Sequence, residues 1–201
     1  MRDGDGVLAR VDGVVDAAFE PLRGVAPVDR AAAALSNLSD YGLVWVGLAA
    51  LKGRRAGPDR RRAVLALGVA GWSSLLVSRL MKRTVERPRP GEHLAAGVRP
   101  PTSSSFPSGH TLAAFTTAIV LSETEVGTAA AVGFAGAVAA SRVHLRAHHP
   151  TDVLGGAAIG SLLGLLLRPA VRVVTPGSRR RKPGRRPRQG MDTRDYLLER
   201  L

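Results

Sequence analysis

The sequence predicts an all-α integral membrane protein: a helical bundle of about five transmembrane helices with an amphipathic helix before it. Several apolar stretches approach the roughly 20 residues that span a bilayer. The chain of 201 residues is 45% hydrophobic with only 4% aromatics, so its apolar content is mainly small and aliphatic, which lets helices pack closely. Its basic residues form two clusters beside the apolar stretches, as expected for segments on one side of a membrane.

Residues 7–22 are predicted to form the amphipathic helix, within an N-terminal segment of residues 1–30. The apolar side chains of this stretch recur at helical spacing, and its charged side chains fall between them. We expect the helix to lie in the membrane interface or against the bundle; the alternative is a soluble helix that packs on a partner. We expect no cleavable signal peptide, because no basic segment followed by an uninterrupted apolar stretch is found there.

The transmembrane domain is expected to cover residues 31–170. Its predicted crossings are residues 31–51, 63–81, 110–121, 127–140 and 153–167. The last three are short for a span, so each is expected to include flanking polar turns.

Glycines in the last two predicted crossings indicate close helix packing. Small residues at a helix surface let backbones approach one another in a membrane. In the last crossing they recur every fourth residue, which also permits a homodimer. The glycines concerned are Gly127, Gly133 and Gly136 in the fourth crossing and Gly156, Gly160 and Gly164 in the fifth.

Two basic clusters set the expected orientation. Residues 52–62 hold six Lys or Arg, and the tail after Val174 holds nine. Basic segments prefer the cytoplasmic side, and five crossings place both clusters there. The connections 82–109 and 141–150 then face the outside of the membrane. A composition rich in Ala, Arg and Gly is typical of bacteria with GC-rich genomes, so we expect a multi-pass protein of the bacterial plasma membrane.

The net charge of +13 arises largely from these clusters, and the chain has no cysteine. The absence of cysteine excludes disulfides and thiolate metal sites. The tail, residues 175–201, is too polar to fold alone and is expected to be disordered. We expect it to contact anionic lipid head groups and not nucleic acid.

Three segments expected on the external side carry chemistry: residues 82–90, 106–111 and 141–152. Their positive charge runs against the preference of basic residues for the cytoplasm, which indicates an anionic ligand. Arginine and lysine suit phosphate oxygens, and backbone N–H groups at a helix N-terminus add donors. The residues expected to surround one phosphoryl group are Lys82, Arg89, Ser108, Gly109 and Arg142.

His148 and Asp152 are four residues apart, so on a helix their side chains would meet. A carboxylate bonded to one ring nitrogen leaves the other as a nucleophilic lone pair. His110, from another segment, could protonate a leaving alkoxide. The alternatives are a structural His–Asp pair, a mere turn at residues 107–110, or metal ligands. No other His, Asp or Glu has ligand spacing, so we expect no metal and no other cofactor.

These segments resemble the signature of the type 2 phosphatidic acid phosphatase (PAP2) superfamily: K-x6-R-P, P-S-G-H and S-R-x5-H-x3-D. All three blocks are present without gaps or substitutions, beginning at Lys82, Pro107 and Ser141. They span residues 82–152, so neither the N-terminal helix nor the basic tail is covered.

The resemblance implies a helical-bundle phosphatase that uses a phosphohistidine intermediate and no metal. By position, His148 is similar to the nucleophile, Asp152 to its orienting carboxylate, and His110 to the acid that protonates the leaving group and later activates water. The phosphate pocket is implied at the five residues named above. Within the third block, His144, Arg146 and His149 occupy free positions and are expected at the rim at most.

The implied substrate is a phosphomonoester or pyrophosphate of a lipid. The compact chain is similar in plan to the decaprenylphosphoryl-phosphoribose phosphatases, which favours a polyprenyl-linked substrate. Undecaprenyl pyrophosphate, phosphatidic acid and phosphatidylglycerophosphate remain alternatives. Two other functions are weighed against this one: phosphotransfer to a lipid or sugar acceptor, and a non-catalytic lipid-binding scaffold. Arg87 forms a second Arg-Pro pair, but only four residues separate it from Lys82, so Arg89 is preferred.

Overall fold

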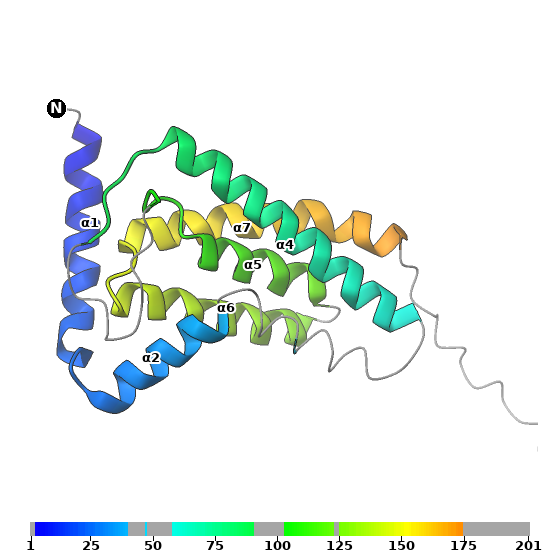
Figure 1. Ribbon diagram of the computed structural model, residues 1–201, viewed down its shortest axis with the longest axis horizontal. Helices are drawn as coiled ribbons and strands as arrows, with labels where there is room; N and C mark the ends of the chain where they lie inside the picture. Colours follow the sequence, from blue (N-terminus) through cyan, green and yellow to red (C-terminus); the bar gives the residue numbers. More distant parts are fainter. Residues whose placement is uncertain (1–2, 40–46, 48–57, 91–102, 123–124, 175–201) are drawn as a thin grey trace, which may run out of the picture.

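The computed structural model describes residues 3–39, 47, 58–90, 103–122 and 125–174 (Figure 1). Over these residues the chain is helical and contains no strand, as the sequence predicts. The predicted basic tail lies outside them. The helices are α1 (Asp3–Phe19), the short 3-10 helix η1 (Glu20–Leu22), α2 (Ala26–Ser39), α4 (Pro58–Thr84), α5 (Gly109–Leu121), α6 (Glu125–His144) and α7 (Pro150–Val174).

Helix α5 lies at the centre of the bundle. Helices α4, α6 and α7 all pack against it and run lengthwise beside it (Figure 1). Nine of its 13 residues are buried, because a helix that is apolar or small on every side has no face that prefers water. The buried Thr116 hydroxyl donates to two carbonyl oxygens, of Leu112 in its own helix at 2.9 Å and of Gly160 in α7 at 3.0 Å.

The glycine repeat of α7 brings its backbone against α5. A Cβ atom placed at Gly160 would lie 2.4 Å from the Leu112 carbonyl oxygen, and one at Gly156 would lie 2.7 Å from the Ser108 carbonyl oxygen. Only glycine permits backbones to meet this closely. The predicted close packing of the last crossing is therefore confirmed. Since the repeat faces α5 in the same chain, it is not available for a dimer.

The glycines of α6 behave differently. A Cβ atom at Gly133 or Gly136 would meet no atom within 4 Å in the described part of the chain. The prediction of close packing at these two positions is therefore wrong. Helix α6 packs through the neighbouring Ala135 and Val138, both of which are fully buried.

Three helical segments are long and apolar enough to cross a membrane: Ala63–Thr84, Val126–His144 and Pro150–Arg172. Helix α5 is apolar but, at 13 residues, is shorter than a full span. The predicted crossing at residues 31–51 lies largely outside the described residues, so five crossings stay a prediction. Large apolar side chains on the outer surface support a lipid environment: Trp72 of α4 is 76% exposed and Leu166 of α7 is 65% exposed.

Helix α1 lies across one end of the bundle and contacts α6 and α7 (Figure 1). Three of its apolar side chains, Val7, Leu8 and Val14, are exposed, whereas Phe19 packs against a buried apolar cluster of α6 and α7. Asp12 is buried in their place, at 7% exposure. The helix therefore lies against the bundle, as one of the two expected placements has it, and a position of its exposed apolar residues in the membrane interface stays a prediction. Polar bonds of Asp12 hold the helix there, and Val7, Leu8 and Val14 face outward.

Candidate active site

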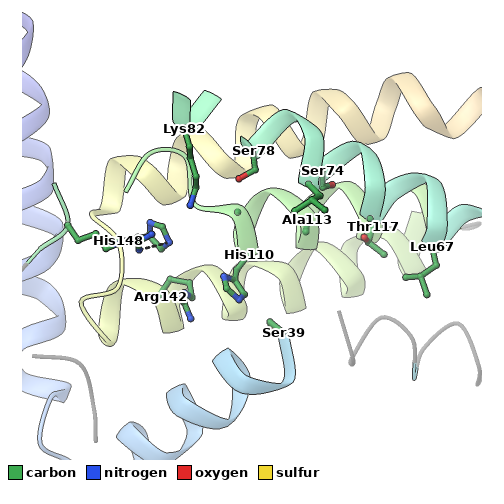
Figure 2. Close-up of a pocket in the computed structure, with 14 residues that line it drawn as sticks. Ser39, Leu67, Ser74, Ser78, Lys82, His110, Ala113, Thr117, Arg142 and His148 are labelled. Atoms are coloured by element: carbon green, nitrogen blue, oxygen red, sulfur yellow. Dashed lines mark hydrogen bonds between the residues drawn. The ribbon is translucent and has the colours of Figure 1, made fainter. Parts of the chain in front are cut away.

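The three predicted segments meet at the end of the bundle that α1 crosses. A cavity of about 470 Å³ opens there between α2, α4, α5, α6 and the turn that precedes α7 (Figure 2). Six of the eight predicted site residues line it: Lys82, Arg89, Gly109, His110, Arg142 and His148. Ser108 and Asp152, both fully buried, lie behind its wall.

His148 lies in the turn before α7 and is 3% exposed. Its Nδ1 atom is 2.8 Å from the Ser105 carbonyl oxygen, which can only accept a hydrogen bond, so Nδ1 carries the proton. Its Nε2 atom is 3.3 Å from Nη1 of Arg89, a group that can only donate. Both contacts assign the same tautomer, in which Nε2 has the lone pair and faces the cations of the cavity. This is the form that a nucleophilic imidazole requires.

Asp152 does not make the direct bond to His148 that its spacing predicts. Its Oδ2 atom is 3.8 Å from His148 Nδ1, beyond hydrogen-bond distance. The reason is that α7 begins at Pro150, so His148 is outside the helix and the four-residue spacing does not align the two side chains. The Asp152 carboxylate instead accepts from the Ser105 hydroxyl and from the His149 backbone N–H at 2.8 Å. It holds the loop that orients the imidazole.

The three predicted phosphate-binding cations enter the cavity from separate elements. Lys82 is in the last turn of α4, and its Nζ atom is 3.2 Å from the Ser103 hydroxyl. Arg142 is in the last turn of α6, is 3% exposed, and donates from Nη1 to the hydroxyl of Ser36 in α2. Both side chains line the cavity, so each brings a positive charge to its wall.

Arg89 is the cation most fully fixed by the backbone. It donates to the carbonyl oxygens of Ser103 at 3.2 Å, Ala147 at 2.6 Å and Ser104 at 3.3 Å. These neutral acceptors orient the guanidinium without cancelling its charge. The positive charge therefore remains for a ligand next to His148.

The first turn of α5 supplies the remaining predicted groups. Gly109 is the first residue of α5, so its N–H has no acceptor within the helix. A Cβ atom there would lie 3.1 Å from the Ser78 hydroxyl oxygen, so a larger residue would crowd α4. His110 follows, and Figure 2 shows its imidazole beside Arg142 on the cavity wall.

Ser108 is placed differently from its prediction. Its N–H donates to the Asp152 carbonyl oxygen at 3.0 Å, and its hydroxyl accepts from Thr111 at 3.0 Å. It therefore joins the α5 and α7 termini and does not line the cavity. It occupies the N-cap position of α5 without a side-chain cap bond, which fits the structural alternative of a turn at residues 107–110.

Three further histidine and arginine residues of the third block make contacts outside the cavity. His144 is buried against Asp29 of α2, with 2.7 Å between Nε2 and Oδ1. Arg146 pairs with Glu20 at 2.8 Å, and the His149 ring is 3.2 Å from the Pro88 carbonyl oxygen. None of the three is among the residues that line the cavity.

Two residues important to the site were not singled out by sequence reasoning: Ser105 and Arg87. Ser105 orients His148 through its carbonyl oxygen, and Arg87 donates to Asp152 from Nη1 at 2.5 Å. For Arg87 the sequence signal was the second Arg-Pro pair. Its spacing from Lys82 excluded it as the phosphate-binding arginine of the signature and gave no indication of a contact with Asp152. For Ser105, whose backbone oxygen acts, residue type carries no signal.

Burial lowers the pKa of His148 to about 4, with Arg89 and Arg142 acting in the same direction and Asp152 opposing them. The neutral, nucleophilic form therefore persists well below the ordinary histidine pKa of 6.5. We expect the acid limb of kcat/KM that reports His148 to lie near pH 4 to 5, at roughly the lowered value. The measurement is a pH profile of kcat/KM, corrected for substrate ionisation by phosphorus NMR. A limb that stays at 6.5 after correction would contradict it.

Comparisons with known proteins agree with this geometry. The sequence pattern of the PAP2 superfamily matches residues 63–175. The chain is 36% identical over 146 residues to a decaprenylphosphoryl-5-phosphoribose phosphatase from Mycolicibacterium smegmatis, covering 72% of this chain and 80% of the relative. It is 34% identical over 134 residues to a protein of the same name from Mycobacterium tuberculosis, covering 66% and 75% respectively.

Two solved structures share the fold. A transmembrane PAP2-type phosphatidylglycerolphosphate phosphatase from Bacillus subtilis superposes with a TM-score of 0.69 at 24% identity, covering 85% of this chain and 89% of that one. LpxE from Aquifex aeolicus superposes with a TM-score of 0.61 at 26% identity, covering 79% and 92%.

Proposed function

The chain belongs to the PAP2 superfamily and is a membrane lipid phosphatase, and on that premise we propose that it hydrolyses a phosphomonoester of a polyprenyl-linked sugar through a phosphohistidine intermediate. The observation that carries the proposed mechanism is the state of His148. A buried imidazole with its proton fixed on Nδ1 presents the Nε2 lone pair to a cavity that three cations line.

In the first step, the phosphate ester lies among Lys82, Arg89 and Arg142. Nε2 of His148 attacks phosphorus, and the bond between phosphorus and the ester oxygen breaks. The electron pair of that bond goes to the leaving oxygen, which takes a proton from His110. The cations stabilise the charge on the equatorial oxygens, and the Ser105 carbonyl stabilises the positive ring that forms.

In the second step, water replaces the departed alcohol. His110, now neutral, takes a proton from the water as its oxygen attacks phosphorus. The bond between nitrogen and phosphorus breaks, and its electron pair returns to Nε2. Inorganic phosphate leaves, and both histidines regain their starting states.

The cavity wall formed by α4 supports a substrate with a polar segment between phosphate and hydrocarbon. Lys82, Ser78 and Ser74 are spaced by four residues and share one face, and Gly71 and Leu67 continue it. From Lys82 to Ser74, a distance of about 12 Å along the helix, the wall changes from charged to hydroxylic. Beyond Ser74, at Gly71 and Leu67, it is apolar. This order matches a phosphate, a sugar and a lipid chain.

The buried Ser74 hydroxyl supports the same substrate. It has no hydrogen-bond partner among the described residues, although Ser74 lines the cavity. A buried hydroxyl without a partner is unfavourable, and a substrate hydroxyl could supply the bond. The relatives at 34–36% identity are named for a phosphorylated ribose on a decaprenyl carrier, which has hydroxyls in this place.

The proposed orientation places the cavity at the external membrane surface and the basic tail in the cytoplasm. Figure 1 shows that α4 begins and α7 ends at the end of the bundle opposite to α1. The start of α4 and the end of α7, which connect in sequence to the two basic clusters, therefore lie away from the cavity, and this agrees with the preference of basic residues for the cytoplasm.

Phosphate release from a panel of lipid phosphates tests this function. The purified protein in detergent is assayed with EDTA on a polyprenylphosphoryl pentose 5-phosphate, phosphatidic acid, phosphatidylglycerophosphate and undecaprenyl pyrophosphate. We expect the sugar lipid to have a kcat/KM at least about 10-fold above phosphatidic acid and undecaprenyl pyrophosphate, since a site built for hydroxyls rejects ligands that lack them, and above phosphatidylglycerophosphate, which offers a single glycerol hydroxyl and no sugar ring. Activity lost with EDTA would contradict the metal-free mechanism, and equal turnover of all four would contradict the substrate class.

The variant Ser74→Ala sharpens the assignment. It is expected to lower the preference for the sugar lipid by about 3-fold to 10-fold, which corresponds to one hydrogen bond. Ser73→Ala is the matched control, because Ser73 is the adjacent serine of the same helix and does not line the cavity. If both variants keep the wild-type preference, Ser74 does not read the sugar.

A further inference from the structure

The cross-bundle helix α1 reaches the active site through one buried carboxylate. Asp12 accepts a hydrogen bond from Nη2 of Arg87, with 2.5 Å between Nη2 and Oδ2. It also accepts from the Thr151 backbone N–H at 2.8 Å and from the Thr151 hydroxyl at 3.0 Å. Asp12 lies outside the 63–175 region that matches the superfamily, so this group is an addition to the shared core.

The bond to Thr151 places Asp12 at the N-terminus of α7. Because α7 begins at Pro150, the Thr151 N–H has no acceptor within the helix. A carboxylate at this end satisfies that donor and is stabilised by the helix dipole. Asp12, a residue of α1, therefore caps the N-terminus of α7 at Thr151, the residue before Asp152.

The bond to Arg87 connects Asp12 to the nucleophile. The guanidinium forms a bridge, with Nη2 on Asp12 and Nη1 on Asp152, each at 2.5 Å. Asp152 in turn accepts from the Ser105 hydroxyl, and the Ser105 carbonyl oxygen orients Nδ1 of His148. The planar fork of arginine can hold two carboxylates in fixed directions, which a single contact cannot do.

The charges of the bridge also matter, because the single cation of Arg87 is shared by the two carboxylates of Asp12 and Asp152. Arg87 lies between two carboxylates, so the Asp152 charge is shared with a cation that Asp12 already balances. Without Asp12, the Arg87 guanidinium would be held by Asp152 alone and could move together with it. Ser105, which donates to Asp152, would then no longer hold its carbonyl oxygen in a fixed direction toward His148. The attack of Nε2 needs such a direction to be maintained within a fraction of an ångström.

We propose that Asp12 is a positioning residue for the phosphatase reaction: through Arg87 it fixes Asp152 and Ser105 so that His148 presents Nε2 to the substrate phosphorus. The N-terminal segment, for which the sequence assigned no function, thereby becomes part of the catalytic apparatus. This inference rests on the proposed function, because it assumes that His148 is the nucleophile.

The test compares Asp12→Asn with Asp16→Asn in the full-length protein. Asp16 lies one turn further along α1 and pairs with Arg23, so its variant removes an acidic contact of α1 without touching the bridge. We expect Asp12→Asn to lower kcat about 10-fold to 100-fold and to change KM less than about 3-fold, as for other groups that orient a reacting residue. The Asp16→Asn variant is expected to remain within about 2-fold of wild type in both constants.

Two further measurements keep the outcome unambiguous. Asp12→Glu keeps the carboxylate charge. We expect the decrease in log kcat in this variant to be at most about half of the decrease in Asp12→Asn. Binding of inorganic phosphate to Asp12→Asn is expected to match wild type, because the cations of the cavity are unchanged. An unchanged kcat in Asp12→Asn, an equal loss in Asp16→Asn, or no recovery in Asp12→Glu would overturn the inference.

Where Asp12→Asn does not yield folded protein, Arg87→Lys takes its place. Lysine keeps the charge but cannot hold both carboxylates in fixed directions. It is expected to lower kcat about 10-fold with KM nearly unchanged, and wild-type kcat in this variant would overturn the inference. A wild-type protein that releases no phosphate from any lipid would contradict the proposed function instead.

Discussion

Replacing His148 by alanine is expected to lower kcat for lipid phosphate hydrolysis by about 10⁴-fold or more, because the group proposed to form the covalent intermediate is removed. The side chain is buried and its Nδ1 proton is held by the Ser105 carbonyl, so the loss is one of chemistry at Nε2. The measurement is steady-state phosphate release at saturating lipid in detergent.

The adjacent histidine provides the matched control. His149 does not line the cavity, and it bonds to Asp152 through its backbone N–H and carbonyl, which alanine keeps, so His149→Ala is expected to keep activity within about 3-fold. A labelled phosphoryl group should be trapped on the wild type by acid-free quenching and be missing from His148→Ala. Labelling that survives this substitution would assign the nucleophile to another residue.

The same trapping experiment separates the role of His110. With p-nitrophenyl phosphate the leaving group needs no proton, so His110→Asn should still form the phosphohistidine. The second step lacks its base, so the labelled protein should accumulate. If His110→Asn shows neither labelling nor phosphate release, His110 acts in phosphate binding or in the first step, and not as the base for water.

Replacing Gly160 by alanine is expected to cause the largest loss of stability. The added Cβ atom would lie 2.4 Å from the Leu112 carbonyl oxygen and 3.0 Å from its Cα atom, both parts of the α5 backbone, which cannot move aside as a side chain can. Overpacking of this kind lowers the free energy of unfolding by about 3 kcal/mol, so we expect the Tm to fall by roughly 6–12 °C. Thermal unfolding in detergent, followed by circular dichroism, measures it.

The control is Gly133→Ala in α6, which adds the same methyl group where no atom of the described residues outside its own helix backbone lies within 4 Å. This variant is expected to be neutral or slightly more stable, since alanine is favoured over glycine in a helix by about 1 kcal/mol. Equal Tm values for the two variants would show that α5 and α7 do not meet as closely as described.

The candidate site was predictable from sequence to the extent that it depends on residue type and order. Lys82, Arg89 and Arg142 are basic residues beside predicted crossings, on the side where the sequence predicts few basic residues, and the structure brings all three to one end of the bundle. Helical spacing likewise predicted the close packing of Gly156 and Gly160. Amphipathic spacing in α1 predicted a helix but not its contact, because the buried residue is the charged Asp12.

By itself the sequence determined that the chain is helical, that it enters a membrane, and that cations and histidines gather at one end. Such properties follow from local periodicity and from the cost of placing charge in lipid, and both are written along the chain. Only the tertiary structure decided what touches His148. Because α7 begins at Pro150, His148 lies outside the helix and its imidazole bonds to the Ser105 carbonyl oxygen and not to Asp152. Because α1 packs across the end of the bundle, Asp12 contacts Arg87. Those contacts join residues that lie 43 and 75 positions apart, and no local pattern can specify them.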